Sequence, residues 1–115
     1  MKEDLHSFLP LSPAILYILL SLVEQDRHGY GIMQEVNRLS EGRYKLGPGT
    51  LYDNLEKLLN DALVKETPRP AGDDDRRRRY YRLSDLGRHV LDAEVSRLKG
   101  LFRGLKPRLR PMEGV

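Results

Sequence analysis

The sequence predicts an α+β domain that is mainly helical and carries one small β-hairpin. Three stretches within the first 61 residues place apolar side chains at helical spacing. Two short stretches, 63–67 and 79–83, are rich in β-branched or aromatic residues and are separated by a polar loop. A last stretch, from residue 84 onward, returns to helical spacing and predicts a further, longer helix.

The composition fits one soluble domain with a single core. The chain has 115 residues, of which 39% are hydrophobic and 32% are charged. It has no cysteine, which excludes disulfides and thiolate metal sites. The start, MKEDLHS, contains acids where a signal peptide is basic, and the longest apolar run, 14–20, is too short to span a bilayer. We therefore expect a cytoplasmic protein with no membrane partner and no cofactor.

Two helices are predicted before residue 41. Ser12 is an N-cap residue followed by Pro13 at the first helical position, and the residues after them are apolar almost all round. A helix of this kind is buried on most sides, so 13–25 is predicted to be the central core helix. The next helix, 29–40, is stopped by Gly42. Its apolar stripe consists of Ile32, Met33, Val36 and Leu39.

The third predicted helix, 48–61, has one apolar and one polar face. Pro48 marks its start, and the brief segment RYKL at 43–46 before it is a candidate for a short strand. The apolar stripe consists of Leu51, Leu55, Leu58 and Leu59. The opposite face carries Thr50, Asp53, Asn54 and Lys57, with Tyr52 beside them.

The strands 63–67 and 79–83 are predicted to pair as the hairpin. Tyr81 and Leu83 share one face of the second strand, so we expect them to pin it to the core while the arginines face outward. The loop PRPAGDDDRR is longer than a tight hairpin turn. We therefore expect its tip to be mobile.

A long last helix, 84–106, begins with Ser84 as an N-cap candidate. Its apolar residues form a heptad seam of about two repeats, consisting of Leu91, Val95, Leu98, Phe102 and Leu105. The seam is the predicted dimer interface. The alternative is packing onto the first helix of the same subunit, and both contacts can coexist. The basic tail, 107–115, is predicted to be loose.

Helices followed by a two-stranded hairpin are typical of a winged helix-turn-helix, with the hairpin as the wing. We divide the chain into a winged helix-turn-helix DNA-binding domain at 1–83, a C-terminal dimerisation helix at 84–106 and a flexible basic tail at 107–115. Residues 1–68 have a net charge of −3 and residues 69–115 a net charge of +6. The basic part is either the footprint of a polyanionic partner or a solvated surface.

Three segments resemble the PadR family of bacterial transcriptional regulators. They are HGYGI at 28–32, GTLYDNLEKLLNDALV at 49–64 and RRRRYYRLSDLGRHVL at 76–91. The resemblance implies a winged helix-turn-helix that pairs through its C-terminal helix and binds palindromic operator DNA, usually as a repressor. Many members of the family respond to small aromatic compounds. The chain ends soon after its first C-terminal helix and is similar in this to the short subfamily.

Two features depart from the family's pattern. Asp53 follows the tyrosine of GTLY, where many relatives have proline or a neutral residue. Because a carboxylate repels phosphate, Asp53 either points aside, reads a cytosine amino group or weakens binding. The chain also has no tryptophan, which some drug-binding relatives use in a central dimer pore. The resemblance therefore does not extend to a multidrug-sensing role.

Contacts to double-stranded DNA are assigned to the third helix, the wing and the start of the second helix. Gly49 lets the backbone approach DNA closely, and Thr50 holds a phosphate at the helix start. Tyr52 and Asn54 bind a phosphate or a base edge, and Lys57 binds a phosphate. The alternatives are a core role for Tyr52 and solvated roles for Asn54 and Lys57. Further contacts come from Tyr30, Arg76, Arg77, Arg78 and Arg79. For Tyr30, and for His28 beside it, the alternative to a phosphate contact is packing and capping.

Other function classes find less support in the sequence. It contains no GxSxG, P-loop, HExxH or CxxC pattern, and its three histidines lack the spacing of metal ligands, so we expect neither an enzyme nor a metal site. The alternative function is a winged-helix protein- or RNA-binding module without operator specificity. By family analogy, the candidate pocket for a small aromatic ligand is lined by Tyr17, Leu98 and Phe102.

Overall fold

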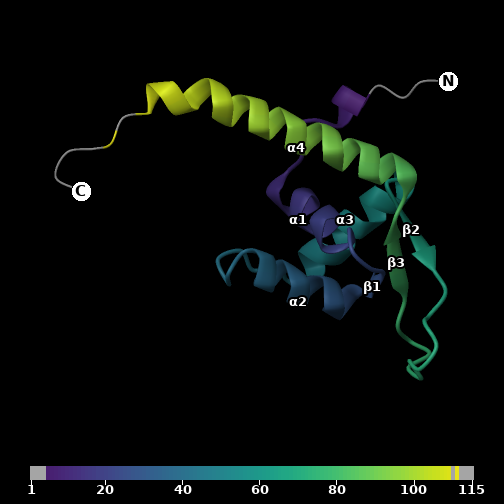
Figure 1. Ribbon diagram of the computed structural model, residues 1–115. Coiled ribbons are helices and arrows are strands. Elements are labelled where there is room, and N and C mark those ends of the chain that lie inside the picture. Colours follow the sequence, from purple (N-terminus) through teal and green to yellow (C-terminus); the bar gives the residue numbers. More distant parts are fainter. Residues whose placement is uncertain (1–4, 110, 112–115) are drawn as a thin grey trace.

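The computed structural model describes residues 5–109 and 111. Within these residues the chain forms four α-helices, two short 3-10 helices and three strands, as Figure 1 shows. The helices are η1 (Leu5–Phe8), α1 (Pro13–Ser21), α2 (Gly29–Leu39), α3 (Pro48–Asn60), α4 (Asp85–Leu105) and η2 (Lys106–Arg108). The strands are β1 (Arg27–His28), β2 (Val64–Thr67) and β3 (Tyr80–Leu83). The predicted α+β class, with a hairpin and a long last helix, is confirmed.

Three of the four α-helices begin at a side chain that caps them. The Ser12 hydroxyl accepts the Ile15 N–H at the start of α1, at 3.2 Å. At the start of α4, the Ser84 hydroxyl accepts the Gly87 N–H at 2.9 Å. The cap of α2 is the imidazole of His28, whose Nδ1 lies 3.1 Å from the backbone N of Gly31. Each bond satisfies a backbone donor that has no partner inside the helix.

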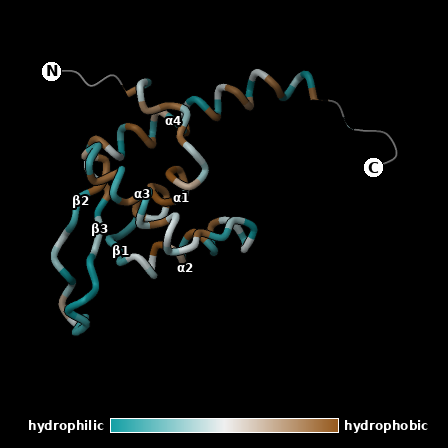
Figure 2. Tube along the Cα trace, turned by 180° about the vertical axis from the view of Figure 1, so that it is seen from behind, coloured by the Kyte–Doolittle hydropathy of each residue, from teal (hydrophilic) through white to brown (hydrophobic). Residues whose placement is uncertain are grey.

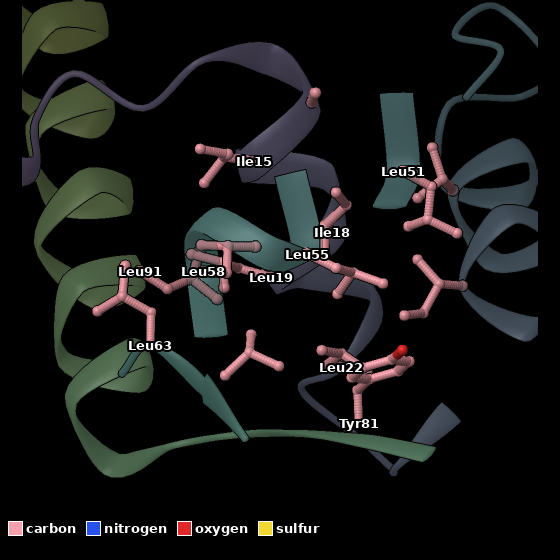
Figure 3. Close-up of a cluster of buried hydrophobic side chains, with 14 of the residues drawn as sticks. Ile15, Ile18, Leu19, Leu22, Leu51, Leu55, Leu58, Leu63, Tyr81 and Leu91 are labelled. Carbon is pink, nitrogen blue, oxygen red and sulfur yellow. The ribbon is translucent and has the colours of Figure 1, made fainter. Parts of the chain in front are cut away.

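Helix α1 is the centre of the core, as predicted, and contacts α2, α3 and α4. Its apolar side chains face the leucine stripe of α3 (Figure 3). Tyr81 of β3 closes the cluster on one side and is buried, while Leu83 packs at its edge. The prediction that these two residues hold the wing to the core is therefore confirmed. The members of the stripe that are completely buried are Leu51, Leu55 and Leu58.

The sheet has three antiparallel strands in the order β1-β3-β2, one strand more than predicted. In β1, Arg27 pairs with Tyr81 and His28 pairs with Tyr80. Two residues are too few to show the alternation that predicts a strand. Strand β1 forms because the edge of β3 that does not pair with β2 is available for backbone hydrogen bonds. Outside the backbone, a pair between Asp26 and Arg82 joins the same segments, with N and O 2.8 Å apart.

One candidate strand and one predicted helix end are wrong. Residues 43–46 form no strand, because the backbone of Tyr44 bonds to the Ser40 hydroxyl at the end of α2 instead of a strand partner. The first helix ends at Ser21 and not near residue 25. The Ser21 carbonyl accepts a bond from the Arg27 side chain at 2.7 Å, which turns the chain back toward the sheet.

Helix α4 crosses one side of the body and then projects beyond it (Figure 1). Its first half is packed, with Val90 and Leu91 buried in the core and Val95 against the core's edge. From Ser96 onward, every described residue is exposed. Hydrophobic and hydrophilic residues alternate along the trace of this projecting half (Figure 2). The predicted tail at 107–115 lies partly outside the described residues.

A first prediction concerns the end of α3. Ala62 has a positive φ of 61°, and the next N–H, of Leu63, bonds back to the Leu58 carbonyl at 3.0 Å. This is the helix end at which glycine is favoured, since a Cβ costs energy in left-handed backbone. We expect Ala62→Gly to raise the free energy of unfolding by about 0.5 kcal/mol. Urea unfolding measures it. The reverse change, Gly42→Ala at φ 76° after α2, should lower the free energy of unfolding by about 1 kcal/mol. If both changes shifted the free energy of unfolding in the same direction and by the same amount, the argument from left-handed backbone would be wrong.

Candidate nucleic-acid interface

The start of α3 is open to solvent. Gly49 and Thr50 are exposed, and, apart from the neighbouring residues and the backbone of the helix itself, no atom lies within 4 Å of the position that a Cβ on Gly49 would take. The N-cap residue, Gly47, has no side chain to accept the first N–H groups of the helix. A phosphate or a base edge can therefore approach this end of the helix closely.

Tyr52 reaches from α3 to the start of α2. Its ring is 51% exposed, and its hydroxyl oxygen lies 2.3 Å from where a Cβ on Gly29 would be. Only glycine at position 29 leaves room for this arrangement. The predicted core role for Tyr52 does not apply, because the ring lies on the surface between two helices.

A pocket of about 430 Å³ forms where the starts of α2 and α3 meet the wing. It brings together five of the predicted contact residues. They are Tyr30, Tyr52, Arg77, Arg78 and Arg79. His28, Gly29 and Tyr81 complete the lining. His28 belongs to the predicted contact region at the start of the second helix, whereas the sequence analysis did not assign Gly29 and Tyr81 to the interface. The two glycines that flank Tyr30 were the available signal, since they allow another segment to approach closely.

Acidic residues of the wing contact its arginines. An Asp75 oxygen accepts the Arg77 Nε at 3.3 Å, and Arg78 lies 3.4 Å from Asp73 and 3.8 Å from Asp75. Asp73 also accepts the Tyr80 hydroxyl at 2.5 Å. That bond, together with the Asp75 N–H and Arg78, lowers the pKa of Asp73 to about 2, so the carboxylate stays charged at neutral pH. These contacts order the loop while leaving the arginines near the surface.

His28 stands between the wing and α2. Its ring meets that of Tyr80 edge-on, with centroids 5.2 Å apart. Burial, and then the positive charge of Arg78, lower the pKa of His28. The imidazole is therefore neutral at pH 7, and Nδ1 keeps the lone pair that accepts the Gly31 N–H.

Two predicted contact residues lie on another flank of α3. Asn54 is half-buried, and its amide donates to the Thr50 carbonyl at 2.8 Å. Asn54 and Lys57 line a separate groove of about 590 Å³ between α3 and the segment that precedes α1. Asp53 is exposed and forms no ion pair with the described residues.

Comparisons with known proteins identify the family. A family described as the transcriptional regulator PadR-like family matches residues 8–93. The chain belongs to this family. The transcriptional regulator Rv3488 of Mycobacterium tuberculosis is 35% identical over 88 residues, which cover 76% of this chain and 78% of that protein.

Solved structures show the same PadR fold. A PadR family transcription regulator from Clostridium difficile superposes with a TM-score of 0.72 at 21% identity, covering 86% of this chain and all of that one. A PadR-like transcription factor from Bacteroides fragilis gives a TM-score of 0.66 at 26% identity, covering 83% of this chain and 88% of that one. The winged helix-turn-helix is thereby confirmed. The chain is a DNA-binding transcriptional regulator and not an enzyme.

The heptad seam of this PadR-like protein is divided in two. Leu91 is 2% exposed and Val95 is half-buried, so the first part packs within the subunit. The second part is exposed. Leu101, which was not part of the predicted seam, is exposed beside it. We call this set the α4 apolar face: Leu98, Leu101, Phe102 and Leu105.

The three candidate effector residues lie on different parts of the PadR fold. Tyr17 of α1 stacks on Tyr44, with ring centroids 4.9 Å apart. Leu98 and Phe102 are exposed on α4, and Phe102 has Lys106 over its ring at 6.0 Å. A ligand site formed by all three would therefore need the surface of a second subunit.

The described residues contain no helix long and apolar enough to cross a membrane. Within 5–109 and 111, no group of three or more histidine, cysteine, aspartate or glutamate residues could hold a metal ion.

A second prediction concerns Gly29. A methyl group there would displace the Tyr52 ring, so we expect Gly29→Ala to weaken DNA binding roughly tenfold. The ring can swing away, so stability should change little. Fluorescence anisotropy with one duplex measures the affinity. Gly31→Ala is the control, because its Cβ would meet only ordinary contacts, the nearest at 3.5 Å. Equal affinities of the two variants would show that the position of Tyr52 is irrelevant.

Proposed function

We propose that this regulator binds palindromic double-stranded operator DNA as a homodimer and represses transcription. The observation that carries the proposal is the pocket in which Tyr30, Tyr52 and three wing arginines converge beside the open start of α3. In this proposal residues 1–83 bind DNA, and the helix at 84–106 pairs two subunits. The basic tail at 107–115 adds non-specific attraction to DNA.

Helix α3 acts in the major groove, with its first turn nearest to the base edges. Gly49 and Thr50 approach the DNA, and Tyr52 reaches a phosphate or a base. Arg77 and Arg78 exchange their aspartate partners for phosphates of the adjacent backbone, since guanidinium pairs with both kinds of oxygen. Arg76 and Arg79, which form no ion pair with the described residues, make the first contacts.

Pairing through the α4 apolar face supports the dimer. A soluble chain rarely exposes four large apolar side chains side by side on one helix without a partner for them. Two subunits related by a two-fold axis present two α3 helices, which read half-sites about one turn of DNA apart, roughly 34–36 Å. Pairing also brings a second surface to Tyr17, Leu98 and Phe102, where a small aromatic effector would bind and relieve repression.

The test of operator binding is selection of bound sequences from random duplex DNA. We expect an inverted repeat with a fixed spacing between its halves. Competition with RNA of the same sequence distinguishes the alternative function, a winged-helix protein- or RNA-binding module. Enrichment of no symmetric sequence, with RNA competing as well as DNA, would end the proposal in favour of that alternative.

A third prediction separates the wing from α3. Arg78→Ala removes a phosphate contact, so we expect weaker binding to all sequences and a salt slope lower by about one. Tyr52→Phe, which removes an uncharged hydroxyl from the side chain that α3 contributes to the pocket, is expected to alter sequence preference and leave the slope unchanged. Binding to operator and to unrelated DNA, measured over a range of salt concentrations, checks both. If the two variants behave alike, the division of roles between wing and helix is wrong.

A further inference from the structure

Glu94 is the last fully buried residue of α4. Its side chain is 1% exposed, Val95 after it is half-buried, and every described residue from Ser96 onward is exposed. Position 94 is therefore the end of the packed part of α4. The rest of the helix projects beyond the body of the subunit (Figure 1). A carboxylate is rarely this buried unless it is paired and hydrogen-bonded.

The Glu94 carboxylate joins α4 to a distant segment. One oxygen accepts the backbone N–H of Leu11, just before α1, at 2.8 Å. Both oxygens contact Arg97, at 2.5 and 3.2 Å. The hydrogen bonds from Arg97 are the main cause that lowers the pKa of Glu94, so the group is ionised at neutral pH. Hydrogen bonds to a charged acceptor are stronger than hydrogen bonds between neutral groups. The bond from Leu11 to Glu94 is of this kind and joins residues 83 positions apart in the sequence.

The bond between Glu94 and Leu11 lies where a small change in the angle of α4 moves the far end of the helix by a large distance. From Glu94 to Leu105 the helix rises about 16 Å, and the α4 apolar face occupies the far part of that length. A small rotation of α4 about position 94 moves that face relative to α1, and α1 packs directly on α3. The angle of α4 on the body therefore sets how far apart two α3 helices stand in a dimer.

We propose that Glu94 is a positioning residue that fixes the spacing of operator half-sites by locking α4 to the segment before α1. The proposal rests on the proposed function, since it requires a dimer that reads two half-sites. Glu94 touches no DNA. Its bond to Leu11 restricts α4 to one angle, so the dimer tolerates one spacing. One base pair more or less changes the separation by about 3.4 Å and rotates one half-site by about a tenth of a turn.

The experiment compares Glu94→Met with Glu35→Met. Methionine matches glutamate in length and tolerates burial, so both variants should fold, which circular dichroism checks. Glu35 is the matched control, because it is also buried and also pairs with an arginine three residues later, Arg38, at 2.5 Å. It lies on α2, and its ion-pair partners, Arg38 and Arg27, are not residues of α4. Affinity is measured for operator duplexes whose spacer is changed by one or two base pairs, and for a single half-site.

We expect the wild type and Glu35→Met to prefer one spacer by roughly tenfold over its neighbours. Glu94→Met should lower that preference to about threefold or less, with the single half-site bound as in the wild type. Leu11→Pro, which removes the N–H donor from the other side, should act in the same direction; if it does not fold, Glu94→Met decides.

An unchanged spacer preference in Glu94→Met, or an equal loss in Glu35→Met, would overturn the inference. A wild type that shows no spacer preference at all would instead contradict the proposed function, so the two failures are distinguishable.

Discussion

Phe102→Glu is expected to turn the proposed dimer into a monomer and to lower operator affinity at least about 100-fold. Phe102 is 59% exposed and lies in the middle of the α4 apolar face. A charge there would have to be buried in the paired interface, opposite the same charge of the second subunit, because a two-fold axis brings like patches together. Loss of pairing removes the advantage of binding two half-sites at once, which is worth 10²–10⁴ in affinity.

Light scattering measures the mass, and anisotropy with operator and half-site duplexes measures the affinity. The half-site should be bound equally well by wild type and variant. Ser96→Glu is the control, because it adds the same charge to an exposed position on the opposite side of the helix. A Phe102→Glu variant that remains a dimer would show that α4 pairs through another face or not at all.

Gly87→Ala is expected to lower the free energy of unfolding by about 3 kcal/mol or more, which corresponds to a fall in Tm of roughly 10 °C. A Cβ at this position would lie 2.0 Å from the Leu63 carbonyl oxygen and 2.9 Å from a methyl carbon of Leu83. The first of these atoms is backbone and cannot swing away. The Leu63 carbonyl also accepts the Ser84 N–H at 3.1 Å, so moving it breaks the junction between β2 and α4.

Thermal and urea unfolding measure the effect. Gly100→Ala is the control in the same helix, because its Cβ would have only an Arg103 nitrogen nearby, at 4.0 Å. That change should stabilise the helix by up to about 1 kcal/mol. If Gly87→Ala were as stable as wild type, the close packing of α4 on the end of α3 and β2 would be refuted.

The core and the wing were predictable because their signals are local. Helices α1, α3 and α4 begin where capping residues and prolines predict, and Tyr81 faces the core because side chains alternate along a strand. Strand β1 and the loop at 43–46 were missed, since each depends on which neighbour is available for its hydrogen bonds. Of the residues assigned to DNA contact, Tyr30, Tyr52 and three arginines line one pocket, while Asn54 and Lys57 line a different groove.

The winged helix-turn-helix, the basic wing and the resemblance to the family follow from the sequence alone, because periodicity, caps and motif spacing are properties of neighbouring residues. The packing of the folded chain separates the apolar residues of α4 into buried and exposed ones, since one heptad seam serves both. It also placed Glu94 against Leu11 and Tyr52 over Gly29. These contacts join residues far apart in the chain, and their energies depend on distances of a few ångströms that no local pattern records.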